Sequence, residues 1–149
     1  MRYSQSFEIA ATPEDIWQVM EDLPAWPEWA TSFKRIEITA GEKLALGTQL
    51  RMVVRGAPTS EWVVIACEPG SRLTWETDAR GVHTVADHVL ERTESGTRLT
   101  LAVSYSGAMA RFWAPLISYV SKRNLALEGN GLKVQAERAA VGAARSAGI

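Results

Sequence analysis

The sequence has little cysteine and little histidine, and it has no long apolar run. One cysteine, Cys67, among 149 residues excludes a disulfide within the chain and gives no support for an oxidising compartment. The first eight residues lack the apolar core of a secretory signal. The longest uncharged stretches, 99–110 and 112–121, are shorter than the roughly 20 apolar residues that cross a bilayer. We therefore expect a soluble, cytoplasmic protein with no membrane span.

An excess of positive charge is also missing. The chain has 16 basic and 17 acidic residues, a formal net charge of -1 and a pI near 6.1. Proteins that bind nucleic acid or anionic membranes usually carry a basic surplus, so this balance argues against both partners. The chain is expected to be a monomer or a homodimer.

Metal and nucleotide signatures are absent too. His83 and His88 lie five residues apart, so a straight strand would point them to opposite faces, and Cys67 is far away in sequence. No third ligand for a zinc site is visible. The only close glycine pair, Gly129 and Gly131, lies in a helical pattern and matches no phosphate-binding loop. We predict neither a metal nor a cofactor.

Tryptophan, in contrast, is abundant, with six in a chain that is 46% hydrophobic. A buried tryptophan removes roughly 150–250 Å² from water, so six rings need a large core or an aromatic-lined pocket. Taken singly, each ring is more simply explained by core packing. Taken together, they favour a pocket, because a small solid core rarely needs so many. The length fits a single domain spanning residues 1–149.

Hydrophobic alternation predicts seven strands separated by short turns. Thr12 and Pro13 mark the start of a helix after the first strand, with Thr12 as its cap, and a second short helical turn covers 25–30. Six further strands follow as an antiparallel meander. The expected strands are 3–10, 33–39, 47–55, 61–68, 72–77, 82–92 and 97–106.

After Gly107 the apolar spacing changes to three and four residues, which predicts a helix from about Ala110 to Arg138. The expected apolar stripe includes Trp113, Leu116, Ile117, Val120, Asn124, Leu127, Gly131, Val134 and Arg138. Gly129 and Gly131 cost helix stability and are interpreted as soft points or as places of close approach to the sheet. The tail from 139 to 149 is expected to fray.

This order of elements implies an α+β architecture. A seven-stranded antiparallel sheet and one long apolar-faced helix bury both surfaces only if the sheet curls round the helix. Such a curl leaves space between the concave face and the helix. Large side chains that line this space without filling it would enclose an apolar cavity.

Several short motifs carry a resemblance to a known family. They are Thr12-Pro13-Glu14-Asp15-Ile16-Trp17, Asp22-Leu23, Trp26-Pro27-Glu28-Trp29, Glu68-Pro69-Gly70, Arg72-Leu73-Thr74-Trp75, Gly96-Thr97-Arg98-Leu99-Thr100 and Leu132-Lys133. These motifs resemble the START-like polyketide cyclase/dehydrase and lipid-transport proteins, the SRPBCC group. The resemblance covers about residues 3–138, and it implies the helix-grip fold and a hydrophobic small molecule, lipid or polyketide in the cavity. Some members are enzymes and others are carriers, and no shared catalytic signature can be transferred.

Three polar residues are candidates for cavity chemistry. His88 alternates with Ala86 and Leu90 and would then face inward, but the opposite assignment, with Asp87 inward, is nearly as good. Arg55 belongs either to a solvated convex face or to the cavity, where it would hold a carboxylate or polarise a carbonyl. Tyr105 is the third. The predicted cavity residues are Trp29, Arg55, Trp62, Trp75, His88, Leu90, Leu101, Tyr105, Trp113, Leu116 and Val120.

The sequence therefore leaves three functions open. The favoured one is binding of a small hydrophobic ligand in an enclosed cavity. The second is a cyclase, aromatase or dehydratase that shuttles protons and needs a buried titratable group. The third is a protein-interaction module with a collapsed cavity.

Overall fold

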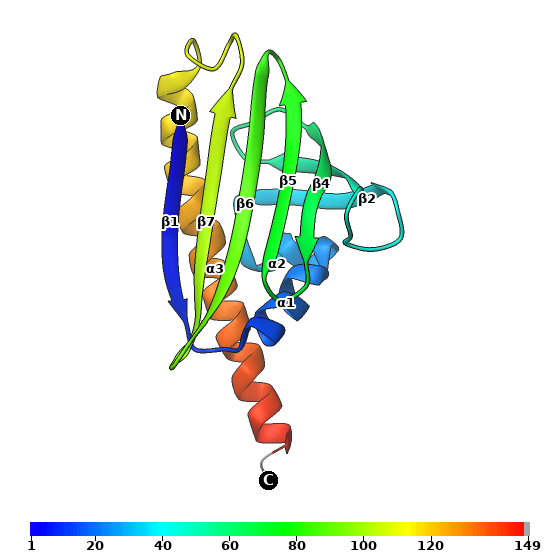
Figure 1. The fold of residues 1–149 in the computed structure, drawn as a ribbon, viewed down its shortest axis with the longest axis vertical. Helices are drawn as coiled ribbons and strands as arrows, with labels where there is room; N and C mark the ends of the chain where they lie inside the picture. The colour runs from blue at the N-terminus through cyan, green and yellow to red at the C-terminus, as the bar shows by residue number, and fades with distance from the viewer. Residues whose placement is uncertain (148–149) are drawn as a thin grey trace.

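The structure, a computed structural model, describes residues 1–147 (Figure 1). Along the chain, a strand is followed by short helical segments, six more strands and a long helix. The elements are β1 (Arg2–Ile9), α1 (Pro13–Glu21), the 3₁₀ helix η1 (Leu23–Ala25), α2 (Trp26–Trp29), β2 (Phe33–Ala40), β3 (Gln49–Val54), β4 (Ser60–Glu68), β5 (Arg72–Ala79), β6 (Val82–Thr93), β7 (Gly96–Ser106) and α3 (Ala114–Ala147). The predicted strands agree with these bounds to within two residues.

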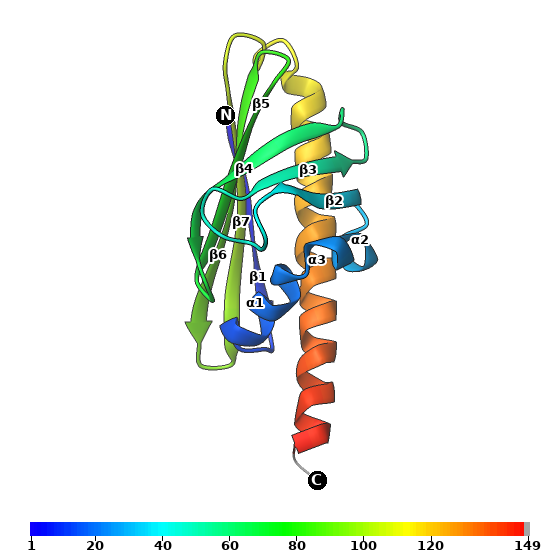
Figure 2. The same cartoon turned by 90° about the vertical axis from the view of Figure 1, so that its right-hand side faces the viewer.

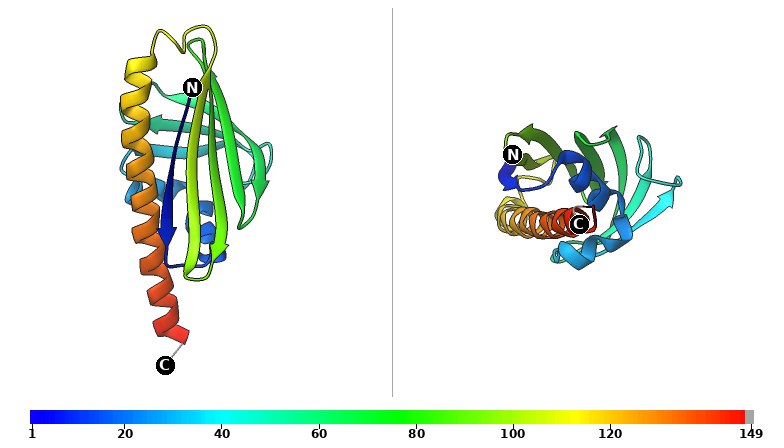
Figure 3. Two further views of the ribbon diagram at one scale, coloured as in Figure 1. Left: turned by 60° about the vertical axis from the view of Figure 1, so that its left-hand side comes forward. Right: turned by 90° about the horizontal axis from the view of Figure 1, so that it is seen from below.

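All seven strands form one antiparallel sheet with the order β1-β7-β6-β5-β4-β3-β2. The sheet bends so strongly that β2 and β3 run across the direction of β1, β7 and β6 (Figure 2). Irregular register in the β2–β3 and β4–β5 pairs accompanies this bend, as expected because bulges increase local twist. The concave face wraps α3 (Figure 3), and the helix-grip prediction is confirmed.

The helices after β1 fill one half of the concave face. The Thr12 hydroxyl accepts a hydrogen bond from the Asp15 amide at 3.1 Å, as the predicted cap requires. The apolar side of α1 is then buried through Ile16 and Met20, and Trp26 of α2 is fully buried beside them. The Trp26 indole N–H donates to the Met20 carbonyl oxygen at 2.9 Å, which joins the two helices.

Two glycines let α3 approach this filled half closely. A Cβ added to Gly129 would overlap the ring of Phe7 on β1, and one added to Gly131 would overlap the carbonyl oxygen of Trp29. The predicted close approach is therefore confirmed. For Gly131 the neighbour is α2 rather than the sheet.

Both ends of α3 differ from the prediction. The helix begins at Ala114 rather than Ala110, because residues before it form turns, and the Met109 amide donates to the Gly81 carbonyl oxygen at 3.0 Å. It continues to Ala147, past the predicted end at Arg138. The alanine-rich segment that was expected to fray is helical, which agrees with the high helix propensity of alanine. Residues 148 and 149 of that tail lie outside the described residues.

The later part of the predicted apolar stripe is also partly wrong. Leu127 and Val134 were assigned to the buried side but are exposed, whereas Leu125 and Leu132 are buried. The true stripe shifts because α3 rests on β1 and α2 through its glycine positions, and these contacts fix its rotation about its axis.

Substitution of Gly131 tests the close approach. Gly131→Ala should lower the free energy of unfolding by roughly 1–3 kcal/mol, because overpacking outweighs the higher helix propensity of alanine. Gly142→Ala is the matched control, since nothing lies within 4 Å of its added Cβ. It should be neutral or stabilising by up to about 1 kcal/mol. Urea unfolding measures both, and equal stability of the two variants would refute the packing argument.

Candidate functional site

The other half of the concave face is not filled. Between this part of the sheet and the first turns of α3 lies a cavity of about 390 Å³, lined by α3, by β3–β7 with Phe33 of β2, and by the β3–β4 and β5–β6 turns. The hypothesis of an interaction module required a collapsed cavity, and a cavity of this volume is not collapsed. The aliphatic and small apolar lining includes Met52, Val54, Val82, Ala86, Leu101, Val103, Leu116, Ile117, Val120 and Leu125.

The six tryptophans divide between this cavity and the core. Trp62, Trp75 and Trp113 line the cavity, and Trp113 is 40% exposed where the cavity opens to solvent. The Trp75 ring lies 5.3 Å from Trp26 and forms the boundary between the cavity and the packed half. Aromatic rings thus form part of the cavity wall as well as the core.

A buried ion pair crosses from the sheet to the helix at the inner end of the cavity. The His88 Nε2 atom on β6 lies 2.8 Å from a carboxylate oxygen of Glu128 on α3. Their side chains are only 4% and 12% exposed. The second ring nitrogen of His88 lies 3.0 Å from the Leu73 carbonyl oxygen. A carbonyl only accepts, so this nitrogen carries a proton and Nε2 is left to share a proton with Glu128.

The charge of Glu128 decides the protonation of His88. Burial alone would lower the pKa of His88, because it disfavours the imidazolium. The hydrogen bond and negative charge of Glu128, helped by the Leu73 carbonyl and Asp87, outweigh this effect and raise the pKa above its ordinary value. The pair therefore holds one exchangeable proton against the cavity wall.

Further polar groups follow the same side of α3. The Tyr105 hydroxyl on β7 lies 2.6 Å from the Ser121 hydroxyl, and burial raises the pKa of Tyr105. The side-chain oxygen of Asn124 is buried in the described structure without a hydrogen-bond partner, and Asn124 lines the cavity. Ser121, Asn124 and Glu128 are three and four residues apart, so they form one polar stripe on an otherwise apolar wall.

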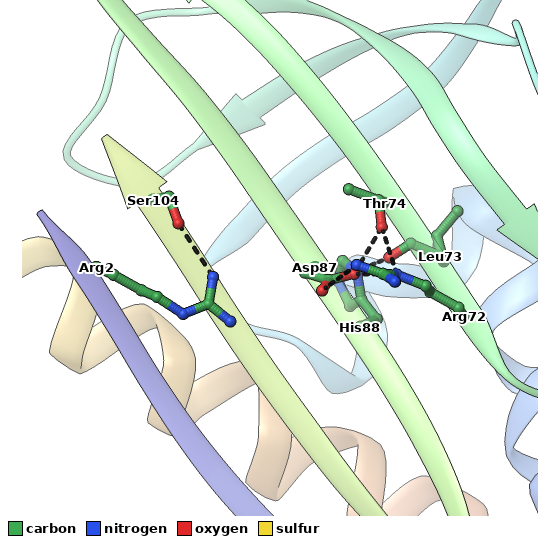
Figure 4. A network of polar contacts seen from close by, with 7 residues as sticks. All are labelled: Arg2, Arg72, Leu73, Thr74, Asp87, His88 and Ser104. Atoms are coloured by element: carbon green, nitrogen blue, oxygen red, sulfur yellow. Dashed lines mark hydrogen bonds and ion pairs between the residues drawn. The ribbon is translucent and has the colours of Figure 1, made fainter. Parts of the chain in front are cut away.

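The structure decides between the two assignments of β6. Asp87 points to the convex face, where it accepts hydrogen bonds from Thr74 at 2.6 Å and from Arg72 at 2.9 and 3.1 Å (Figure 4). His88, the next residue, consequently faces the cavity. His83 lies elsewhere on β6 and contacts Glu76 and Asp78.

Most of the predicted cavity residues meet in one place, but three do not. Trp29 packs against Trp26 at 4.7 Å between α2 and α3, and Leu90 belongs to the half filled by α1. Arg55 is exposed, and its guanidinium donates to the Thr31 carbonyl oxygen at 2.8 Å. The cavity lining includes Trp62, Trp75, His88, Leu101, Tyr105, Trp113, Leu116 and Val120.

Glu128 was missed by the sequence reasoning. It lies 40 residues from His88, and no local motif joins them. The available signal was a carboxylate three residues after Leu125 and four before Leu132, on the apolar face of the helix. The wrong assignment of the buried side in this part of the helix concealed it.

Within residues 1–147, no three His, Cys, Asp or Glu side chains gather in a way that could hold a metal ion. Over the same residues, no helix is both long and apolar enough to cross a membrane.

Comparison with known proteins agrees with this geometry. Residues 1–137 match the family described as polyketide cyclase / dehydrase and lipid transport. The chain belongs to this family. It spans 61% of the length of the curated relatives that it matches. These are uncharacterised proteins of Mycobacterium tuberculosis and Mycobacterium bovis, 30% identical over 102 residues, or 66% of this chain.

Solved structures show the same fold at low sequence identity. The Zhui aromatase/cyclase from Streptomyces sp. R1128 has a TM-score of 0.78 at 17% identity, covering 93% of this chain and 94% of that chain. A START superfamily protein from Mycobacterium smegmatis has a TM-score of 0.75 at 16% identity, covering 92% and 97%.

Removal of the Glu128 charge tests the ion pair. In Glu128→Gln, the pKa of His88 should fall below 6.5, since burial would act without the opposing carboxylate. NMR titration of the ring C–H signals measures this shift. Glu137→Gln on the same helix, where the carboxylate accepts from the Ala10 amide, should leave the pKa of His88 unchanged.

The same pair predicts a pH dependence of stability. A raised pKa in the folded protein means that protonation of His88 stabilises the fold. This contribution is complete below pH 6.5, the ordinary pKa, and is lost as the pH rises through the folded pKa. Unfolding curves of the wild type should show it, and those of Glu128→Gln should not. Identical pH profiles for the two proteins would contradict the assignment.

Proposed function

We propose that this protein binds a small, largely apolar ligand in the cavity between β3–β7 and α3. The supporting observation is the cavity itself, whose aromatic and aliphatic wall carries only a few polar groups. Its volume falls within the range of about 300–1,000 Å³ that is typical of small-molecule sites. The family and fold are consistent with such a ligand.

Apolar burial would supply most of the affinity. Each 100 Å² of apolar ligand surface removed from water contributes about 2.5 kcal/mol, less the cost of ordering the ligand. The polar stripe would orient the ligand. Asn124 offers a buried acceptor without a partner, so a ligand with one hydroxyl or N–H group at its inner end would satisfy it.

Binding can be followed by tryptophan fluorescence, because Trp62, Trp75 and Trp113 line the cavity. Titration with fatty acids, flavonoids and polycyclic aromatics should identify at least one class with a dissociation constant well below millimolar. Native mass spectrometry should show a one-to-one complex. If no compound in a broad panel binds better than millimolar, the proposal is wrong.

A filling variant locates the binding event. Val120→Trp places an indole where Val120 lines the cavity and should weaken binding by at least about tenfold, since that space is lost. Val134→Trp adds the same group at an exposed position of the same helix and should bind as the wild type does. Equal effects of the two substitutions would place the ligand elsewhere.

The buried pair favours a second candidate, a cyclase or dehydratase acting on a poly-β-ketone. Glu128 as a carboxylate would take a proton from a carbon between two carbonyls. The resulting enolate carbon would attack a second carbonyl, and the alkoxide would recover the proton from the Glu128–His88 pair. The Glu128 carboxylate would then remove the remaining proton from the same carbon and pass it to the departing hydroxyl, so that water leaves and the double bond forms. His88, hydrogen-bonded to Leu73, would hold Glu128 in place throughout.

Turnover of a short poly-β-ketone mimic distinguishes the two functions. If the protein is an enzyme, Glu128→Gln and His88→Gln should each lower the rate by about 10²–10⁴-fold, because both remove the shared proton. Arg55→Ala, outside the cavity, should retain the wild-type rate. Turnover that survives the first two changes would remove the His88–Glu128 pair from the mechanism. No turnover, with ligand binding intact, would leave the protein as a binder.

A further inference from the structure

Exposed apolar side chains gather at one end of the molecule, around the entrance to the cavity. We define the mouth patch as Met109, Phe112, Trp113, Leu116 and Tyr119. Phe112 and Tyr119 are 68% and 67% exposed, which is unusual for aromatic rings. Trp113 and Leu116 also line the cavity, so the patch is continuous with its opening.

Cavity lining does not explain this composition. Ile117 and Val120 already cover the inner side of the first turns of α3. Leu116 and Tyr119 lie three residues apart on α3 and are exposed to solvent, and Phe112 is exposed in the turn just before the helix begins. A helix segment that is apolar on both sides is expected only where something covers its outer side.

The mouth patch is held in position by the fold. The Met109 amide donates to the Gly81 carbonyl oxygen at 3.0 Å in the turn between β5 and β6. The Trp113 amide donates to the Met109 carbonyl oxygen at 3.2 Å, and the Phe112 and Trp113 rings pack edge to face at 5.0 Å. Both turns lie together at one end of the sheet (Figure 1). The rings are therefore presented on an ordered surface.

Positive charge surrounds the patch. Arg80, which is exposed, forms part of the cavity lining, and exposed Arg111 directly precedes Phe112. Lys122 and Arg123 are also exposed and lie one helical turn after Tyr119. Within residues 1–147 these four side chains form no ion pair, whereas cations such as Arg51 on the sheet do. Residues 96–127 contain no aspartate or glutamate at all.

We propose that the mouth patch docks on an anionic lipid bilayer. Aromatic and aliphatic side chains enter the boundary between headgroups and acyl chains, and unpaired arginine and lysine side chains contact the phosphates. An anionic bilayer offers both an apolar layer for the rings and a surface of negative charge for the cations. A protein partner would usually pair each of these cations with its own carboxylate. Docking here would place the cavity opening against the membrane, so an apolar ligand would enter without crossing water.

Vesicle flotation tests the proposal without any cavity ligand, so its result is independent of the proposed function. The wild type should float with phosphatidylcholine vesicles that contain about 40% phosphatidylglycerol, whose negative surface potential attracts basic side chains, and not with pure phosphatidylcholine. Raising the salt to about 0.5 M should release it, because exposed charges are then screened.

Matched variants locate the contact. Phe112→Ser/Tyr119→Ser should reduce the floated fraction by at least about tenfold, since two rings leave the bilayer. Leu46→Ser/Val141→Ser removes two apolar side chains that are also exposed, but lie elsewhere, and should bind as the wild type does. Arg111→Gln/Lys122→Gln should weaken binding by about tenfold or more, and Lys34→Gln/Arg35→Gln on β2 should not.

Circular dichroism and thermal unfolding check that each variant is folded, so that a loss of binding reports on the surface. Failure of the folded wild type to float with anionic vesicles overturns the proposal and favours a protein partner for the patch. Equal losses in the mouth variants and their controls overturn it as well.

Discussion

The close contact of α3 with the rest of the molecule along only part of its length determines what the protein can do. Gly129 and Gly131 bring the helix backbone against Phe7 and Trp29, and α1 and α2 fill the sheet beside them. Nearer its beginning, the helix faces the strongly bent part of the sheet with no layer in between. The same curvature that buries the core therefore leaves the cavity, and Trp75 separates the packed half from the open one.

The polar groups in the cavity depend on this arrangement. His88 and Glu128 meet only because β6 and α3 face each other at the inner end of the cavity. In an apolar surrounding an isolated charge would be costly, so each member needs the other, and the Leu73 carbonyl fixes the proton on the far side of the imidazole. A ligand that reaches this depth meets a site whose charge is internally balanced. Ligand binding leaves the charge balance of this pair unchanged, whereas proton transfer requires the pair to give up or accept its proton.

Much of the fold could be predicted from the sequence, because turns and alternating strands are local patterns. The Thr12 helix cap and the close approach at the glycine pair of α3 could also be predicted from the sequence. The rotation of α3 was not, since it is set by contacts with residues over 100 positions earlier, such as Phe7. That error hid Glu128. Leu90 was misplaced for a related reason: alternation gives the face of a strand but not which half of that face is filled by α1 and which is empty. Arg55 was misplaced because β3 ends at Val54, so strand alternation does not extend to it. Net charge likewise concealed the local gathering of cations around the cavity entrance.

The length of α3 has a practical consequence. The helix has 34 residues and is about 50 Å long, and its last turns extend beyond the sheet, at the opposite pole from the cavity entrance (Figure 1). Residues 141–146 are exposed and have no part in the core. A dye, a sensor chip or a fused carrier attached through this protruding rod would thus hold the molecule upright, with its opening directed outward and unobstructed.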